Sequence, residues 1–331
     1  MLNGFRSLPA LVIAASLAAA PAARGSQGPY TSSRLTPELI ERLLPGPIEL
    51  IEAGDIVGAE QSFERQLAQA VQQYGPGSVA AGDLLAAFGL TLFHATHDPV
   101  IRRRAIVYLR RSADAYTAAL GRNHPEVGLA MADVGQALLT LTPEGPAPEA
   151  EAALEDAWRI RQASLGPRNV ETASSLSSLA RVRGLPSHTR GERARIEASA
   201  ALFREAIRDF GTLRVEPGLF GSISTRFELA RMYLANGLVS EAAQAALDAQ
   251  ADYRANFAGE EEMCSLLVSH SRSFAHRLDR EGHRQAGDAI RAGLEEGIPC
   301  HEPWDGDFPA PIFVPEPADL PPEPEPAPEP G

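Results

Sequence analysis

Few residues of this sequence have the types and the spacing that chemistry requires. His94 and His97, followed by Asp98, come nearest to a metal-binding group. A zinc site needs three or four converging ligands, so this group is more typical of the solvated end of a helix. We therefore expect no bound metal.

Motifs of known enzyme classes are missing as well. The sequence contains no Gly-x-Ser-x-Gly, no His-Glu-x-x-His, no calcium-binding loop and no Gly-x-Gly-x-x-Gly after a strand. All 30 basic residues are arginine. The lack of lysine excludes Schiff-base chemistry and a P-loop lysine. We expect no catalytic residues and no cofactor.

Cys264 is a candidate nucleophile. A nucleophilic thiol needs a base placed beside it. His270 and His276 lie six and twelve residues further along the same predicted helix, and these offsets do not flank the thiol. A redox protein or an enzyme that uses Cys264 stays open as an alternative.

The elements that hold these residues are predicted to be helices. Aromatic residues make up 6% of the chain and hydrophobic residues 44%, so the core must consist largely of Ala, Leu and Val. A core rich in Ala and Leu packs helices closely and makes a poor sheet. The expected fold class is therefore all-α.

A repeat of about 45 residues organises the chain. Gly75, Gly121, Gly166 and Gly211 follow one another at intervals of 46, 45 and 45 residues. Each follows a run with helical character, where glycine is a common C-cap because it accepts left-handed backbone. The four runs are Ala59–Tyr74, Val100–Leu120, Glu149–Leu165 and Glu192–Phe210.

Further helical runs follow these glycines, at Val127–Leu141 and Thr172–Val182, so that each repeat is a helix pair, A then B. Small residues recur within the A helices at Gly89, Gly135 and Ala180, where a larger side chain would block the approach of a neighbouring helix. A fixed period of this size predicts a solenoid, in which each unit buries its apolar face against its neighbours.

Six helix pairs are expected, and the outer ones depart most from the pattern. Pro45 and Pro47 should break the first A helix, because proline removes a backbone donor and crowds the preceding turn. The predicted pairs are 37–74, 80–120, 126–165, 171–211, 222–258 and 261–297.

Residues 1–23 have the pattern of a secretory signal peptide. Arg6 precedes an apolar stretch of 13 residues, Leu8–Ala20, which is too short to span a bilayer comfortably. Ala20 and Ala22 have the small-x-small spacing of a cleavage site. We expect cleavage near Ala22 and a periplasmic or secreted protein, with an uncleaved anchor as the alternative. Residues 24–36 are expected to be a linker.

Export would place the two cysteines in an oxidising compartment, where an even count favours a disulfide. Cys264 lies near the start of the last A helix, and Cys300 lies just past the end of the last B helix. These points are neighbours in an antiparallel pair. We expect a Cys264–Cys300 disulfide that ties down the terminal repeat, with two unpaired thiols as the alternative.

The net charge of −13 is concentrated towards the C-terminus. Residues 301–331 hold eight carboxylates and no arginine, and prolines interrupt them throughout. We expect residues 37–300 to form the solenoid and residues 301–331 to be an acidic, proline-rich, disordered tail. A nucleic-acid partner would require a basic domain, so none is expected.

The sequence resembles the tetratricopeptide repeat (TPR) family. The clearest unit, Glu228–Leu247, reads ELARMYLANGLVSEAAQAAL and carries the family's Leu-Ala, Tyr, Gly and Glu-Ala at the expected offsets. A second unit, Ala119–Val127 followed by Glu149–Leu154 and Trp158–Arg161, is similar to the longer repeats of kinesin-light-chain type. The resemblance covers about residues 37–297. It implies a right-handed superhelical α-solenoid that serves as a binding scaffold.

The resemblance further implies a binding surface on the concave face, which the A helices line. Such a groove could hold an extended peptide by its backbone amides and a carboxylate by arginine. Ala87 and Leu90 would form its apolar end. Ordinary exposed helix positions are the alternative for each residue. The groove residues that the resemblance implies are Asp133, Gln136, Ser177, Arg181, Glu228 and Arg231.

A cluster of arginines lies on one predicted B helix. A solvated convex face is the favoured interpretation, because charged clusters on helices usually face solvent. The cluster comprises Arg102, Arg103, Arg104, Arg110 and Arg111.

These features favour an exported, non-catalytic scaffold for protein–protein interaction in the cell envelope. Its partner would be a protein or peptide whose identity the sequence does not give, and no membrane span is expected after signal cleavage. The alternative is a structural subunit of an envelope assembly, held by the tail or the convex face. The acidic tail occupying the groove at Arg181 and Arg231 is a further possibility. The oligomeric state does not follow from the sequence.

Overall fold

The computed structural model describes residues 35–142, 147–186, 192–213, 216–256 and 261–295. These ranges contain thirteen helices and no strand. The predicted signal peptide (1–23), the predicted tail (301–331) and Cys300 lie outside the described residues, as does most of the predicted linker (24–36). Leu35, near the end of that linker, is buried in the same core as Leu43 and Leu44.

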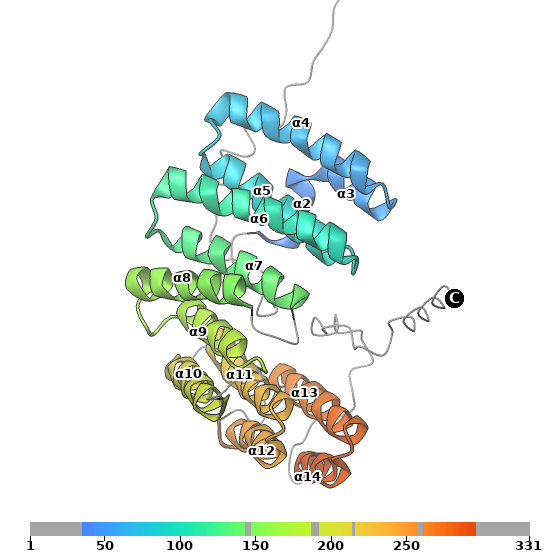
Figure 1. Ribbon diagram of the computed structural model, residues 1–331, viewed down its shortest axis with the longest axis vertical. Helices are drawn as coiled ribbons and strands as arrows, with labels where there is room; N and C mark the ends of the chain where they lie inside the picture. Colours follow the sequence, from blue (N-terminus) through green and yellow to red (C-terminus); the bar gives the residue numbers. More distant parts are fainter. Residues whose placement is uncertain (1–34, 143–146, 187–191, 214–215, 257–260, 296–331) are drawn as a thin grey trace, which may run out of the picture.

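The helices form six pairs that stack one after another (Figure 1). This arrangement confirms the predicted all-α solenoid of A and B helices. The first pair is a split A helix, α2 (Pro37–Leu43) and α3 (Pro45–Glu52), with α4 (Ile56–Tyr74). The other pairs are α5 (Val79–His94) with α6 (Pro99–Leu120), α7 (Pro125–Leu141) with α8 (Pro148–Leu165), α9 (Val170–Arg183) with α10 (Glu192–Thr212), α11 (Glu216–Ala235) with α12 (Val239–Asn256), and α13 (Glu261–Arg280) with α14 (Arg284–Glu295).

Glycines end three of the B helices at the predicted positions. Gly75, Gly121 and Gly166 follow α4, α6 and α8 with φ angles of 89°, 86° and 81°, a left-handed region that glycine adopts without a steric penalty. The prediction of a fourth glycine cap at Gly211 is wrong. Helix α10 continues through Gly211 to Thr212, and the φ of Gly211 is not positive.

Proline divides the first A helix, as the sequence predicted. Helix α2 ends at Leu43 and α3 begins at Pro45. Leu44 joins them with φ −128° and ψ 41°, which is outside the helical region, and its side chain is fully buried. The first repeat therefore begins with two short helices that the buried leucine holds together.

The two helices of a pair approach closely at the predicted small residues. A Cβ atom added at Gly135 would lie 2.5 Å from Cγ of Leu154 and 3.3 Å from the carbonyl oxygen of Ala150. One added at Gly89 would lie 2.8 Å from Cδ2 of Leu109. These separations are below van der Waals contact, so glycine is what lets α7 pack on α8 and α5 pack on α6.

The A helices lie on the inner side of the stack. Each A helix from α5 to α11 contacts the next A helix, whereas among the described B helices α12 and α14 form the one comparable neighbouring contact. Layers that lie closer together are on the inside of a curved stack. The inner face therefore consists of α5, α7, α9, α11 and α13.

None of the helices in the described ranges combines the length and the apolar character needed to cross a membrane.

Candidate functional site

A series of polar side chains runs along the inner face from the third helix pair to the sixth. All of them lie on A helices, and they link these helices one after another. We call this series the polar row. It comprises Gln136, Ser177, Ser178, Arg181, Thr225, Glu228, Arg231 and His270.

The first part of the polar row joins α7, α9 and α11. The amide nitrogen of Gln136 donates to the hydroxyl of Ser178, and the Arg181 guanidinium donates to the amide oxygen of Gln136. Thr225 then donates its hydroxyl proton to Oγ of Ser177 at 3.4 Å. Gln136 and Arg181 are 45 residues apart, which is the repeat period. The same position in successive repeats therefore carries side chains that meet.

The second part joins α11 and α13 through Arg231. Its Nη1 donates to Oε1 of Glu228 at 2.8 Å, and its Nη2 lies 3.2 Å from Nδ1 of His270. The His270 ring also stacks on Phe227, with 5.2 Å between ring centroids and 18° between ring planes. The side chains of Glu228 and Arg231 are 20% and 22% exposed, so the ion pair is partly withdrawn from water but still reachable.

The charges in this part of the row shift one another's pKa values. Burial alone would raise the pKa of Glu228, but the charges of Arg231 and Arg181 outweigh it and the pKa lies below its usual value. Burial and the nearby charge of Arg231 lower the pKa of His270 to about 4. Near neutral pH, Glu228 is therefore ionised and His270 is neutral, so Nδ1 of His270 can accept a hydrogen bond from Arg231.

Asp133 is the one predicted groove residue outside the polar row, and it belongs to a group of charged residues around Arg161. It lies on α7 beside the buried Arg161 of α8, with Glu126 as a second nearby carboxylate. Arg161 is 5% exposed, and its Nη1 donates to Oγ of Ser175 at 2.7 Å and to the backbone oxygen of Glu171 at 3.2 Å. This group pins α8 to α9 across the third and fourth repeats.

Burial dominates the ionisation of Asp133. It raises the pKa of this carboxyl to about 7, although the charge of Arg161 acts in the opposite direction. Burial likewise lowers the pKa of Arg161. Asp133 is half-buried, and its carboxylate forms no hydrogen bond with the polar row.

The structure thus brings together five of the six predicted residues and separates Asp133 from them. Three members of the polar row, Ser178, Thr225 and His270, were not predicted. A signal for one of them existed, because Ser178 lies 42 residues from Gln136, close to the repeat period. Ala87 was expected at the apolar end of the binding groove. It is fully buried and lines no open surface.

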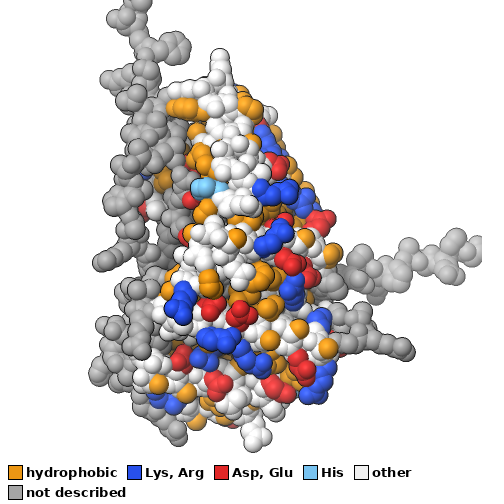
Figure 2. All heavy atoms as spheres, turned by 90° about the vertical axis from the view of Figure 1, so that its left-hand side faces the viewer, with side chains coloured by type: hydrophobic (Ala, Val, Ile, Leu, Met, Phe, Trp, Pro, Cys, Tyr) orange, Lys and Arg blue, Asp and Glu red, His pale blue; other side chains and the backbone are white. Residues whose placement is uncertain are grey.

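The arginine cluster on α6 joins neighbouring B helices. Arg111 pairs with Glu64 of α4 at 2.5 Å, and Arg110 pairs with Glu149 of α8 at 2.6 Å. Arg102 differs from the predicted solvated cluster, because it is 5% exposed and its Nε donates to the backbone oxygen of Thr96 at 2.7 Å. Basic and acidic side chains also lie interspersed on the side of the molecule drawn in Figure 2.

The candidate nucleophile Cys264 and the candidate metal ligand His94 lie on different helices, α13 and α5. Cys264 is 3% exposed near the start of α13 and is not a free thiol. Cys300 lies outside the described residues, so the Cys264–Cys300 disulfide stays a prediction. Within the described ranges, no three His, Cys, Asp or Glu side chains are grouped so that they could hold a metal ion. His94 is exposed at the end of α5.

Comparison with known proteins gives a similarity in structure alone. No protein-family model matches the sequence, and no curated protein matches it. The described residues form an α-solenoid of paired helices with a period of about 45 residues.

Two solved structures are similar to this chain. Both are of a Podosopora anserina putative kinesin light chain with nearly identical TPR-like repeats, and one of them carries a single substitution. The substituted protein is 16% identical, with a TM-score of 0.49, and the match covers 65% of this chain and 95% of that one. The other is 15% identical, with a TM-score of 0.48, and the match covers 67% of this chain and 99% of that one.

Proposed function

We propose that this chain is a non-catalytic repeat scaffold, exported to the cell envelope, that binds an extended peptide or partner segment along the inner face of its A helices. The observation that carries this proposal is the polar row. It sets hydroxyl, amide and charged groups on four successive A helices, and all of them are half-buried except Thr225, which is buried.

The chemistry of the row suits an extended chain. An extended peptide offers backbone donors and acceptors at regular intervals, which hydroxyl and amide side chains can satisfy. Arg181 and Arg231 add guanidinium N–H groups, and those not already bonded within the chain can donate to a carboxylate. A hydrogen bond held in a partly buried setting is also stronger than one in open water.

The sequence supports export, and the state of Cys264 agrees with a scaffold. Residues 1–23 carry the signal pattern, and Cys264 is neither exposed nor a free thiol. Mass spectrometry of protein purified from its natural host tests export directly. We expect an N-terminus at Ala23 or Arg24, and an N-terminus at Met1 would contradict cleavage.

Binding on the inner face is tested by capture of partners from envelope extract with two matched variants. Arg181→Ala/Arg231→Ala removes the two arginines of the polar row. Arg110→Ala/Arg111→Ala removes two arginines of the outer face that pair with carboxylates of neighbouring repeats. Circular dichroism shows whether each variant keeps its helices.

We expect the inner variant to lose a partner that the outer variant and the wild type both retain. Cross-links from that partner should map to α9, α11 and α13. A partner retained by the inner variant and lost by the outer one would favour a structural subunit held by the convex face.

A further inference from the structure

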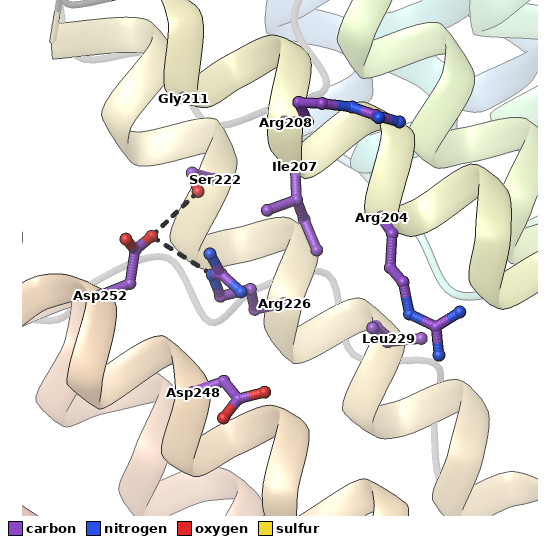
Figure 3. A pocket seen from close by; sticks show the side chains of 9 residues that line it. All are labelled: Arg204, Ile207, Arg208, Gly211, Ser222, Arg226, Leu229, Asp248 and Asp252. Carbon is purple, nitrogen blue, oxygen red and sulfur yellow. Dashed lines mark hydrogen bonds and ion pairs between the residues drawn. The ribbon is translucent and has the colours of Figure 1, made fainter.

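A hollow of about 420 Å³ opens between α10 and α12 on the side of the B helices (Figure 3). Helix α10 forms one wall, α12 forms the other, and α11 forms the floor. Ile207 on the α10 wall and Leu229 on the floor, each largely buried, give the hollow an apolar part. The lining residues are Arg204, Ile207, Arg208, Gly211, Ser222, Arg226, Leu229, Asp248 and Asp252.

Three arginines and two aspartates line the hollow, so it has a small excess of positive charge, and Asp248 of α12 accepts from the neutral amide of Gln244 at 2.8 Å. Asp252 accepts from Arg226 and from Ser222, both at 3.2 Å, so Arg226 is neutralised (Figure 3). Arg204 donates to the hydroxyl of Tyr233 at 2.9 Å. Within the described ranges, neither Arg204 nor Arg208 has an ion pair with a carboxylate. The α10 wall therefore offers two exposed guanidinium groups to an anionic ligand.

Two guanidinium groups beside an apolar floor suit a segment that alternates carboxylates with apolar residues. Residues 314–331 have this composition, with five carboxylates, eight prolines and no basic residue. Proline rings can cover the apolar floor, and a polyproline helix loses little conformational entropy on binding because it is already extended.

The last described helix, α14, packs on α12, which carries one wall of the hollow. Near the end of α14, the backbone oxygen of Gly293 accepts from Arg254 of α12 at 3.1 Å, and that of Ile290 accepts from Gln250 at 2.9 Å. Helix α12 also carries the far wall of the hollow. Packed helices lie about 10 Å apart, whereas the residues from 296 to 315 span up to about 60 Å at ~3.1 Å each. The segment can therefore reach the hollow within one molecule.

We propose that the acidic C-terminal segment, residues 314–331, docks in the hollow between α10 and α12 of its own chain, with its carboxylates on Arg204 and Arg208. This places the segment on the side of the B helices and leaves the polar row open. Arg181 and Arg231 are less suited to hold it, because they already bond with Gln136, Glu228 and His270.

Carbon-detected NMR of the isotope-labelled full chain tests the docking, because it observes prolines as well as glutamates. We expect the signals of residues 316–329 to be broad in the wild type and sharp in Arg204→Gln/Arg208→Gln. Loss of each arginine should weaken docking roughly tenfold. Glu323→Gln/Glu325→Gln/Glu329→Gln, which changes the segment and not the solenoid, should sharpen the same signals.

Two further variants serve as controls. Arg159→Gln/Arg193→Gln removes the same charge from side chains that are 67% and 87% exposed elsewhere, and it should leave the signals broad. Arg181→Gln/Arg231→Gln should also leave them broad.

Three outcomes would overturn the proposal. The first is sharp signals from this segment in the wild type. The second is release of the segment by Arg181→Gln/Arg231→Gln, which would place it on the inner face. The third is broadening that disappears on dilution, which would show that the hollow binds the segment of a second copy.

Discussion

The stability of this fold should depend on pH through two ionisable side chains of the A helices, Asp133 and His270. His270 lies at a contact between repeats, and Asp133 lies at a contact between the two helices of the third repeat. The pKa of each is shifted so that the neutral form is favoured. Burial is the main cause for both, because a low-dielectric surrounding disfavours the charged form. Their effects on stability have opposite dependence on pH.

Asp133 should make the fold less stable as pH rises. Its pKa is raised to about 7, so the folded chain binds more protons than the unfolded chain between about pH 4 and pH 7. Stability falls through that window and stays lowered above it. Asp133→Asn removes this loss, and we expect the variant to exceed the wild type by about 1–2 kcal/mol at pH 8.

Urea unfolding at pH 4 and pH 8 measures this effect. The variant and the wild type should be equally stable at pH 4. Asp114→Asn changes an exposed carboxyl on α6 and should follow the wild type at both values. A variant that is no more stable than the wild type at pH 8 would show that Arg161 holds Asp133 ionised.

His270 should make the fold less stable as pH falls. Its pKa is lowered to about 4, so the unfolded chain binds more protons between about pH 6.5 and pH 4, and stability is lost as pH falls through that window. Protonated Nδ1 can no longer accept from Arg231, and the charge of Arg231 repels the imidazolium while that of Glu228 attracts it. We expect His270 to account for about 2 kcal/mol of the acid-induced loss.

His270→Gln tests this assignment, because glutamine can accept from Arg231 but does not titrate. The variant should lose less stability than the wild type between pH 7 and pH 4 in urea unfolding. His276→Gln, on an exposed position of the same helix, provides the control. Equal losses in all three proteins would contradict the role of His270.

The sequence predicted the helices and their pairing better than it predicted the contacts between side chains. The glycine period and the proline positions predicted five of the six helix pairs nearly to the residue, because these residues restrict the backbone locally. The predicted C-cap at Gly211 was wrong because α10 continues one residue beyond it. The contacts of the polar row depend on how one repeat is set against the next, which local propensity does not determine. For this reason neither the contact of Asp133 with Arg161 nor the place of His270 in the polar row was predicted.

Gly135 should be intolerant of a side chain. The Cβ of Gly135→Ala would lie 2.5 Å from Cγ of Leu154, and Leu154 is fully buried and cannot move aside. We expect a loss of about 1–3 kcal/mol in the free energy of unfolding. Gly211→Ala is the matched control, because nothing lies within 4 Å of its added Cβ and its φ is not positive.

Thermal unfolding of the two variants separates packing from helix propensity. Gly211→Ala should unfold at the wild-type temperature or slightly above it, since alanine favours a helix by up to about 1 kcal/mol. If Gly135→Ala unfolds at the same temperature as Gly211→Ala, the close approach of α7 and α8 does not depend on glycine.

In the whole molecule, each repeat of a solenoid is stabilised by its neighbours. Among the described helices, the last pair, α13 and α14, packs on α11 and α12, and the described residues place no repeat beyond it. Cys264 lies buried near the start of α13. A covalent link from this position would further stabilise this pair.

Cys264 and Cys300 should form that link. A loop closed between them is worth about 3–4 kcal/mol in the chain-entropy model. Peptide mapping without reductant should recover the two cysteines in one cross-linked peptide. Cys264→Ser should lower the unfolding temperature and speed hydrogen exchange in α13 and α14 more than in α5 and α6. Recovery of two free thiols from the folded protein would contradict the link.

We propose that the inner face of the A helices is the binding surface. Hydrogen exchange of the wild-type chain, alone and saturated with a captured partner or its minimal peptide, tests this assignment. We predict that protection on binding appears in α7, α9, α11 and α13, at the turns that carry the polar row. Protection confined to the B helices α6, α8, α10 and α12, with the A helices unchanged, would contradict it.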